Sequence, residues 1–313
     1  MKAIIVGLAA LPLFALAGDK IDEQIKVPLD GKVVIENQRG KVTIKSWDKP
    51  SFKVSGELDE LAEGYTLETQ GNVTEFIVKM PRRTKSWNNQ RDGSRLTIYM
   101  PKQSELDFEG VSVDVNVSDF SAGVAVTTVN GDIEATQLSG KIELETVNGD
   151  IEGKELSGNI RYETVNGDIE DMASSGKLRF NAVNGGIESM TQANDIRVEN
   201  VNGEVDFDIA SLKDLRMSTV NGEINVRLRA LEKGANVRFE SVSGDVDFYF
   251  PAELSARFDI DAHAGGRIIN ELSADKEKKA KYGPSRELEF VIKDGDVDVE
   301  IDTVSGRVTL KKL

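Results

Sequence analysis

The sequence predicts an all-β fold, a parallel β-solenoid (β-helix) whose coils contain about 18 residues and two short strands each. Three observations support this prediction. A Val-Asn-Gly corner recurs at a fixed spacing, apolar residues occupy equivalent positions in successive repeats, and charged residues alternate with them. A period repeated this often is typical of a solenoid, and the alternation is typical of strands that bury one face.

The corner asparagine sets the period of the repeat. It recurs every 18 residues over five repeats and then after 19 residues, while Ser243 takes its place in the following copy. Side-chain amides that stack along such an axis can hydrogen bond to one another. We therefore interpret these residues as a structural corner ladder. The ladder comprises Asn130, Asn148, Asn166, Asn184, Asn202 and Asn221.

A second corner, Ser-Gly, lies nine residues after the first, as Ser157-Gly158 does after Asn148-Gly149. It divides each coil into two strands of similar length. Glycine accepts the positive φ that a tight corner requires, and asparagine tolerates it better than most residues. We expect the corner glycines to adopt this conformation.

Apolar residues fall into columns when the repeats are aligned, and a solenoid buries such columns against neighbouring coils. One column precedes the corner at Val129, Val147, Val165, Val183, Val201, Val220 and Val242. Another follows it at Ile133, Ile151, Ile169, Ile187, Val205, Ile224 and Val246. Two more lie in the second half of the coil, at Ile142, Ile160, Leu178, Ile196 and Leu215, and at Leu144, Tyr162, Phe180, Val198 and Met217.

Asn-Gly is also a strong signal for β-hairpins, which would give antiparallel sheets instead. Two features favour parallel stacking. Equivalent positions hold the same class of residue every 18 residues, as stacked coils require. The predicted strands are also too short and too equal for hairpin sheets that would need a second layer.

The regular repeats cover residues 120–250. Residues 18–119 form an irregular N-terminal β region that is continuous with the solenoid, and residues 251–313 form irregular C-terminal β coils and a cap. Solenoids need atypical end pieces to cover their open edges, and both flanks suit this role.

Residues 1–17 are predicted to be a secretory signal peptide. Lys2 precedes an apolar segment that ends in Ala15-Leu16-Ala17, a typical cleavage spacing. An uncleaved membrane anchor is the alternative, but about 15 apolar residues are short for a span of roughly 20. No other stretch is apolar enough to cross a bilayer. We therefore expect a periplasmic, extracellular or cell-surface protein with no transmembrane segment after cleavage.

Composition excludes several classes of function. The net charge of −15 repels phosphate backbones, so we expect no nucleic-acid partner, and the surface suits cations or cationic surfaces better. The absence of cysteine excludes disulfides, thiolate metal sites and cysteine nucleophiles. Nothing in the sequence predicts a cofactor.

The acids that follow the Asn-Gly corner would form a column at the spacing of the coils. Ca²⁺ prefers carboxylate and carbonyl oxygens and could relieve the repulsion between them. The alternative is that these are solvated turn acids, and the calcium-binding nonapeptide GGxGxDxUx is not matched. The candidate calcium ligands are Asp132, Asp150 and Asp168.

Catalysis has little support in the sequence, and we assign no catalytic residue. His263 is the single histidine and lies outside the regular repeats, so a Ser-His-Asp site would depend on it. Cleavage of a polysaccharide by paired carboxylates is the other enzymatic hypothesis, because solenoid grooves suit such polymers. With 54 acidic residues some pair will always be close, so the count does not favour it.

A basic loop stands out at residues 82–95 of this acidic protein. It could contact an anionic glycan or lipid head group, although an ordinary solvated loop is the alternative. Its residues of interest are Arg82, Arg83, Lys85, Trp87, Arg91 and Arg95.

Outward charges between the apolar columns are interpreted as a solvated sheet face with cross-strand ion pairs. They include Glu143, Arg161, Glu163, Arg179, Arg197 and Arg216.

The chain resembles the "putative adhesin" family of bacterial exported β-strand-repeat proteins, a domain of unknown function called DUF4097. The resemblance is carried by ENQRGKVTIKSWD, LTIYMP, the repeated TVNGDIE corners and the terminal DTVSGRVTL. It implies tandem β-strand repeats over nearly the whole mature chain, and it brings no catalytic residues.

These observations predict a non-catalytic cell-envelope binding or scaffold protein that presents a repetitive β surface to a polymer or protein partner. A surface adhesin is the first alternative, and a polysaccharide-active enzyme on a β-helix is the second.

Overall fold

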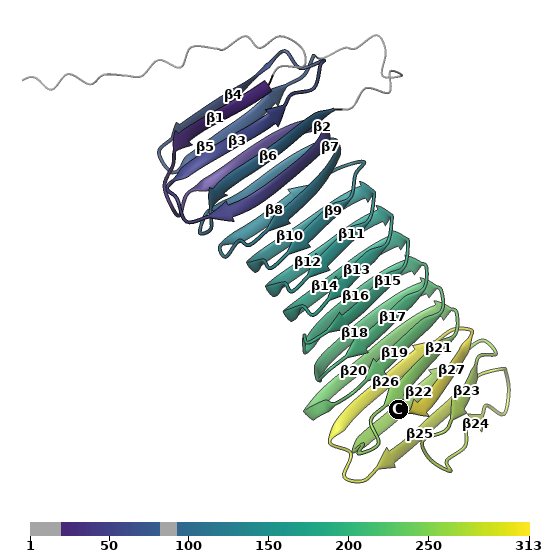
Figure 1. The fold of residues 1–313 in the computed structure, drawn as a ribbon. Helices are drawn as coiled ribbons and strands as arrows, with labels where there is room; N and C mark the ends of the chain where they lie inside the picture. The colour runs from purple at the N-terminus through teal and green to yellow at the C-terminus, as the bar shows by residue number, and fades with distance from the viewer. Residues whose placement is uncertain (1–19, 82–92) are drawn as a thin grey trace, which may run out of the picture.

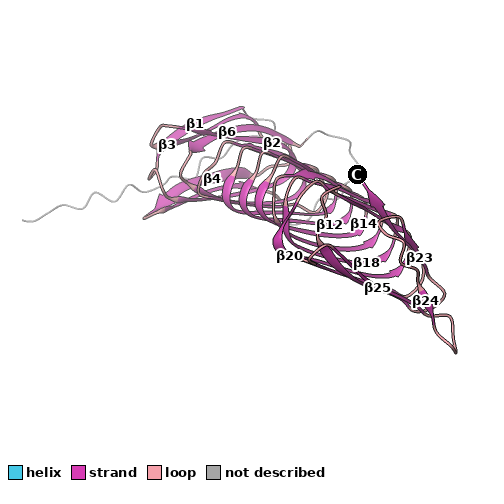
Figure 2. Ribbon diagram, turned by 90° about the horizontal axis from the view of Figure 1, so that it is seen from below, coloured by secondary structure: helices cyan, strands magenta, loops and turns pink. Residues whose placement is uncertain are grey.

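The computed structural model describes residues 20–81 and 93–313, so the predicted signal peptide lies outside the described residues. The described chain contains 27 strands and no helix, all in one continuous sheet. The sheet winds into an elongated rod, and Figure 2 shows its coils one behind another along the axis. The all-β solenoid prediction is confirmed. In the described part, no helix is long and apolar enough to cross a membrane.

Within this continuous sheet, two parallel ladders of strands form the sides of the central coils, and we call them the narrow sheet and the wide sheet (Figure 1). The narrow sheet contains the short strands β9 (Ile133–Thr136), β11 (Ile151–Lys154), β13 (Ile169–Met172), β15 (Ile187–Thr191), β17 (Val205–Ile209), β19 (Ile224–Leu228) and β21 (Val246–Phe250). The wide sheet contains β8 (Gly123–Thr127), β10 (Ser139–Asn148), β12 (Ser157–Asn166), β14 (Ser175–Asn184), β16 (Asp195–Asn202), β18 (Leu212–Asn221) and β20 (Leu231–Ser243).

Successive coils pair in parallel, with each residue beside its equivalent in the next coil. Ile142 pairs with Ile160, for example, and Asn148 with Asn166. The prediction of two similar strands per coil is wrong, because β11 has 4 residues whereas β12 has 10. The longer strand includes the Val-Asn residues of the corner, as β12 does up to Asn166. Fewer residues therefore form the turn than the sequence predicted.

The corner glycines are required by close backbone contact more than by backbone conformation. A Cβ on Gly149 would lie 2.2 Å from the Gly131 carbonyl oxygen, and one on Gly167 would lie 1.9 Å from that of Gly149. The expected positive φ is found at other members of this corner, with φ of 143° at Gly203 and 126° at Gly244, but not at Gly149 or Gly167. At the second corner it is Glu155 and its equivalents that adopt the left-handed conformation, with φ of 55° at Glu155, and Gly158 follows with φ of 123°.

The interior contains the isoleucine, leucine and aromatic columns. Ile142 and Ile160 are fully buried, and the rings of Tyr162 and Phe180 stack with centroids 5.0 Å apart. The valine column that precedes the corner was expected inside, and this expectation is wrong, because its seven members are 37–49% exposed. The preceding residue, such as Thr164, points inward and its hydroxyl donates to the Gly149 carbonyl, so alternation turns the valine outward.

Antiparallel strands appear only near the ends of the described rod. The N-terminal strands are β1 (Lys20–Lys26), β2 (Lys32–Trp47), β3 (Ser51–Glu57), β4 (Gly64–Gln70), β5 (Val73–Lys79), β6 (Ser94–Pro101) and β7 (Glu105–Ser118). Strand β3 lies between β1 and β6 and is antiparallel to both, and β4 is antiparallel to β5.

The C-terminal strands are β22 (Ala256–Ala262), β23 (Arg267–Asn270), β24 (Lys278–Lys279), β25 (Arg286–Ile292), β26 (Val297–Thr303) and β27 (Arg307–Lys312). The last two, yellow in Figure 1, form a coil inserted between β20–β21 and β22–β23. The chain therefore ends inside the stack, and β22 pairs with the antiparallel strand β25 beyond it.

We expect Gly167→Ala to destabilise the fold by about 1–3 kcal/mol, the usual cost of forcing extra atoms into a packed region. The added Cβ would meet backbone, which has little room to move. Gly123→Ala is the matched control, since its Cβ would lie 3.5 Å from the nearest atom. Urea unfolding of both variants measures the difference, and equal midpoints would contradict the close-contact explanation.

Candidate functional site

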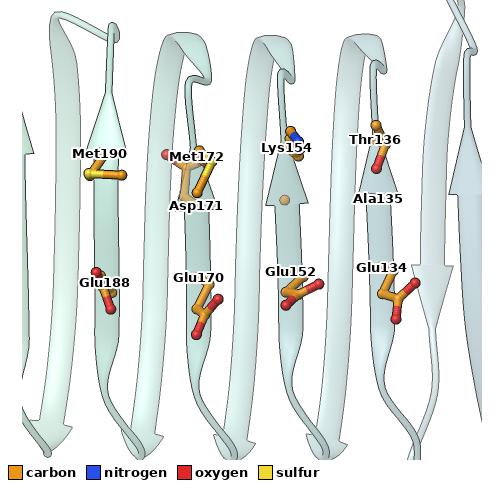
Figure 3. Close-up of a pocket in the computed structure, with 11 residues that line it drawn as sticks. Glu134, Ala135, Thr136, Glu152, Lys154, Glu170, Asp171, Met172, Glu188 and Met190 are labelled. Atoms are coloured by element: carbon orange, nitrogen blue, oxygen red, sulfur yellow. The ribbon is translucent and has the colours of Figure 1, made fainter.

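A groove of about 270 Å³ lies on the outer surface of the narrow sheet, across β9, β11, β13 and β15 (Figure 3). Two columns of outward side chains line it. The first contains Glu134, Glu152, Glu170 and Glu188, and the second contains Thr136, Lys154, Met172 and Met190.

Strand alternation and register place these side chains together. In the sequence IEGK of β11, Ile151 and Gly153 face the interior while Glu152 and Lys154 face outward. Parallel pairing then places Glu152 beside Glu134 on one side and beside Glu170 on the other. Adjacent strands lie about 4.8 Å apart, so the glutamates form a continuous ladder of carboxylates.

The interior beneath the groove departs from the apolar pattern of the other coils. Asp171 is buried there, where its carboxylate accepts hydrogen bonds from the Tyr162 hydroxyl at 2.7 Å and the Ser189 hydroxyl at 2.8 Å. A Cβ on Gly153 would lie 2.1 Å from the Tyr162 hydroxyl oxygen, so the glycine makes room for the tyrosine. Burial raises the pKa of both Asp171 and Tyr162.

The electrostatic environment of the groove favours cations. Lys154 is the single cationic side chain among its lining residues. Within the described part of the chain, Glu152, Glu170 and Glu188 have no ion pair or side-chain hydrogen bond. Asp206 continues the column on β17, and its charge raises the pKa of the neighbouring Glu204. Repulsion among Glu152, Glu170 and Glu188 can be relieved by a partner that carries positive charge.

The groove also offers apolar contact. The side chains of Met172 and Met190 are 47% and 50% exposed, and they lie side by side on β13 and β15 (Figure 3). Methionine is flexible and polarisable, and it adapts to apolar groups of different shapes. The arrangement therefore suits an extended segment that combines cationic and apolar groups.

The candidate calcium ligands form the column beside the groove, where they cap backbone groups. The Asp132 carboxylate accepts a hydrogen bond from the Asp150 N–H at 3.0 Å, and the Asp150 carboxylate accepts one from the Asp168 N–H at 2.8 Å. The third, Asp168, accepts from the Gly186 N–H at 2.7 Å. The described residues contain no group of three or more His, Cys, Asp or Glu side chains arranged to hold a metal ion. Calcium binding at this column stays a prediction, and the hydrogen bonds indicate a structural use.

The corner asparagines are joined by side-chain hydrogen bonds. From Asn148 to Asn202, the amide nitrogen donates to the amide oxygen of the preceding coil, at 2.8 Å from Asn148 to Asn130 and 3.1 Å from Asn202 to Asn184. Asn221 continues the column, where its backbone pairs with Asn202. The column therefore holds adjacent corners together.

The predicted basic loop is only partly covered by the described residues. Five of its residues of interest lie outside the described residues, namely Arg82, Arg83, Lys85, Trp87 and Arg91. The sixth, Arg95, lies on β6, where its backbone is paired with that of Lys41 on β2 and Glu57 on β3. An anionic ligand at this loop therefore stays a prediction.

His263 lies in the C-terminal cap, far along the chain from the groove. Its Nε2 is 3.2 Å from the Asp302 carboxylate, and both side chains are largely exposed. This contact is an exposed polar pair.

The four groove glutamates were missed by the sequence interpretation, although each is the Glu that follows Ile after the corner. The corner segments NGDIE, NGGIE and NGEVD each end in an acidic residue at this outward position, and this recurrence was the signal. Attention to outward positions that keep one charge in every coil would have found the column. The methionine pair had no such signal, because it occurs in only two coils.

Comparison with known proteins supplies the family. The profile of the Toastrack DUF4097 family matches residues 31–311. The chain belongs to this family. The Toastrack family is a domain of unknown function, so membership supports the solenoid fold and assigns no reaction. No curated protein matches the chain.

Three solved structures are similar over nearly their full lengths. A "putative cell adhesion protein" from Clostridium sporogenes is 12% identical, with 94% of this chain and 100% of that chain covered and a TM-score of 0.25. A "putative lipid binding protein" from Parabacteroides distasonis is 14% identical, with coverage of 95% and 97% and a TM-score of 0.41. A "putative adhesin" from Bacteroides fragilis is 13% identical, with coverage of 94% and 97% and a TM-score of 0.34.

We expect the stability of the Asp171→Asn variant, relative to that of the unchanged protein, to increase as pH rises. The folded-state pKa of Asp171 is raised from its ordinary value of 3.8 by burial, so the folded protein holds this proton more tightly than the unfolded chain does. The stability due to that proton is lost as pH rises through the folded-state pKa. Asparagine carries no charge, its amide oxygen can accept one of the two hydroxyl hydrogen bonds, and its NH2 group can donate to the other hydroxyl oxygen.

Melting temperatures measured between about pH 4 and pH 7 test this trend. Asp208→Asn is the control of opposite sign. A hydrogen bond from Arg229 lowers the pKa of Asp208, so its charge stabilises the fold above the ordinary pKa and this stabilisation is lost at low pH. A difference between Asp171→Asn and parent that does not change with pH would contradict the prediction.

Proposed function

We propose that this protein is a non-catalytic binding or scaffold protein of the cell envelope, and that the acidic groove on the narrow sheet is one of its binding surfaces. The partner at this groove is an extended basic segment of another protein, with apolar residues among its lysines or arginines. The observation that carries the proposal is that Glu152, Glu170 and Glu188 have no side-chain partner within the described chain and lie beside two exposed methionines.

The groove is suited to binding because its side chains are held on a rigid sheet. An extended segment laid across the coils presents same-side residues about 6.6 Å apart, so its long lysine or arginine side chains can reach the groove glutamates at several points without a contact in every coil. Several such contacts on one chain add to a useful affinity, because each bound group raises the effective concentration of the next. The acidic surface also attracts a basic partner from a distance and speeds association at low salt.

A fluorescein-labelled peptide of alternating lysine and leucine residues is a suitable probe, with fluorescence anisotropy as the measurement. We expect the double variant Glu152→Gln/Glu170→Gln to bind it about fivefold more weakly, since each exposed ion pair contributes up to about 1 kcal/mol. The matched control is Glu68→Gln/Glu75→Gln, which removes two paired glutamates from the β4–β5 hairpin.

Salt and the methionines separate the two parts of the interaction. Affinity for the peptide should fall as salt rises, whereas the loss caused by Met172→Thr/Met190→Thr should persist at high salt. Equal affinity of the groove variant and the hairpin control would overturn the proposed site.

Export is part of the same proposal, and it is supported by the sequence of residues 1–17. We expect a tagged protein to resist added protease on intact cells of its source and to be digested once the envelope is permeabilised. Digestion on intact cells would favour the adhesin hypothesis over the scaffold.

A further inference from the structure

Five arginines occupy equivalent outward positions on consecutive strands of the wide sheet. Direct backbone pairing joins each of them to the next, from β12 to β20. Strands of one sheet lie about 4.8 Å apart, so the guanidinium groups repeat at that spacing. We call this set the arginine column: Arg161, Arg179, Arg197, Arg216 and Arg238.

Four members of the column have a carboxylate partner. Arg161 pairs with Glu163, and Arg197 pairs with Glu199 at 2.8 Å. Both are contacts between residues two apart on one strand, and Arg161 also lies 4.0 Å from Glu145 on β10, one of the cross-strand pairs expected from the sequence. In the other two, Arg216 contacts Asp214 at 3.2 Å, and Arg238 contacts Glu300 on β26 at 2.6 Å. These arginines are all half exposed, and exposed pairs contribute at most about 1 kcal/mol, so a ligand can replace them.

Arg179 differs from its neighbours. Asn181 stands at the position that Glu163 occupies on β12 and Glu199 on β16. Within residues 20–81 and 93–313, Arg179 takes part in no ion pair, and Lys177 beside it already contacts Asp195 at 3.2 Å.

The outward charges of these three strands give a local excess of positive charge. The cations are Arg161, Lys177, Arg179 and Arg197, and the carboxylates are Glu163, Asp195 and Glu199. Four minus three leaves one positive charge, centred on Arg179, on a chain whose net charge is −15.

We propose that the arginine column binds an acidic polysaccharide laid across the coils, with a carboxylate of one sugar unit held by Arg179. The planar guanidinium donates two parallel hydrogen bonds to a carboxylate, which a lysine cannot do. Arg179 provides the first contact because no internal pair has to break. Further carboxylates of the same chain then exchange with the neighbouring pairs.

The spacing of the column favours a sugar polymer over other anionic chains. An extended peptide presents same-side residues about 6.6 Å apart, which does not match the coil spacing of about 4.8 Å. A nucleic-acid strand carries a phosphate about every 3.4 Å and is repelled by the acidic body. A chain of pyranose units carries one carboxylate on each unit of a stiff backbone, so it loses less conformational entropy than a flexible peptide when several carboxylates meet the column.

This site is independent of the acidic groove, because it uses the other sheet and the opposite charge. Its test therefore leaves the proposed function untouched. The probe is a labelled oligogalacturonate, titrated into the full mature protein at low and physiological salt. Oligoglutamate of similar charge is the comparison for an acidic peptide.

The decisive variant is Asn181→Glu, which restores the partner that the neighbouring coils possess. We expect it to weaken oligogalacturonate binding at least fivefold, and Arg179→Gln to do the same. Thr127→Glu is the matched control, because Thr127 holds the equivalent position on β8, where Ala125 stands in place of the arginine. It adds the same charge to the same sheet face and should change the affinity little.

Each outcome is informative. Weaker binding in Asn181→Glu and Arg179→Gln alone, with unchanged binding in Glu152→Gln/Glu170→Gln, supports the site. Absence of oligogalacturonate binding overturns it, as does an equal loss in Asn181→Glu and Thr127→Glu. Tighter binding of oligoglutamate than of oligogalacturonate would overturn the assignment to a polysaccharide.

Discussion

Backbone contact between stacked corners is the constraint on which the rest of this structure depends. The carbonyl of Gly149 occupies the space where a side chain on Gly167 would begin, and the same contact recurs at the next corners. A coil that slipped by one residue would place a Cβ against this carbonyl and would turn its buried face outward. The register is therefore fixed, and every residue stacks on its equivalent in the next coil.

Stacking of equivalents has a different consequence for each kind of residue. Isoleucines pack on isoleucines, and the amide of Asn148 donates to that of Asn130, so these columns stabilise the stack. Carboxylates repel one another at this spacing. The corner aspartates offset the repulsion because each accepts a backbone N–H, as Asp132 does from Asp150. Of the groove glutamates, Glu134 accepts a hydrogen bond from the Asn116 amide, whereas Glu152, Glu170 and Glu188 have no such compensation within the described chain, which is why we assign these glutamates, and not the aspartates, to binding.

The repeating part of the structure could be predicted from the sequence, and the parts that break the repeat could not. Period, parallel pairing and the all-β class followed from the recurrence of Val-Asn-Gly. The valines were misplaced because an apolar column was taken to mean burial, whereas the inward position belongs to the preceding threonine, such as Thr164. The network of Tyr162 and Asp171 beside Gly153 was invisible, since it joins residues of different columns that compensate one another only in three dimensions.

The two sheets of one coil carry opposite chemistry, and their unequal lengths make this possible. A short strand such as β11 has two outward positions, which the groove fills with a glutamate and one further residue. A long strand such as β12 has more outward positions, so Arg161 can be held beside Glu163 on the same strand. Charge on the wide sheet is therefore mostly neutralised. Asn181 stands where the neighbouring coils have a glutamate, and this one difference leaves an arginine without an ion-pair partner among the described residues. The short strands β11, β13 and β15 have no outward position for such a pair, so their glutamates stand unpaired within the described chain, whereas further along the narrow sheet Arg227 and Arg229 on β19 neutralise Asp206 and Asp208 on β17.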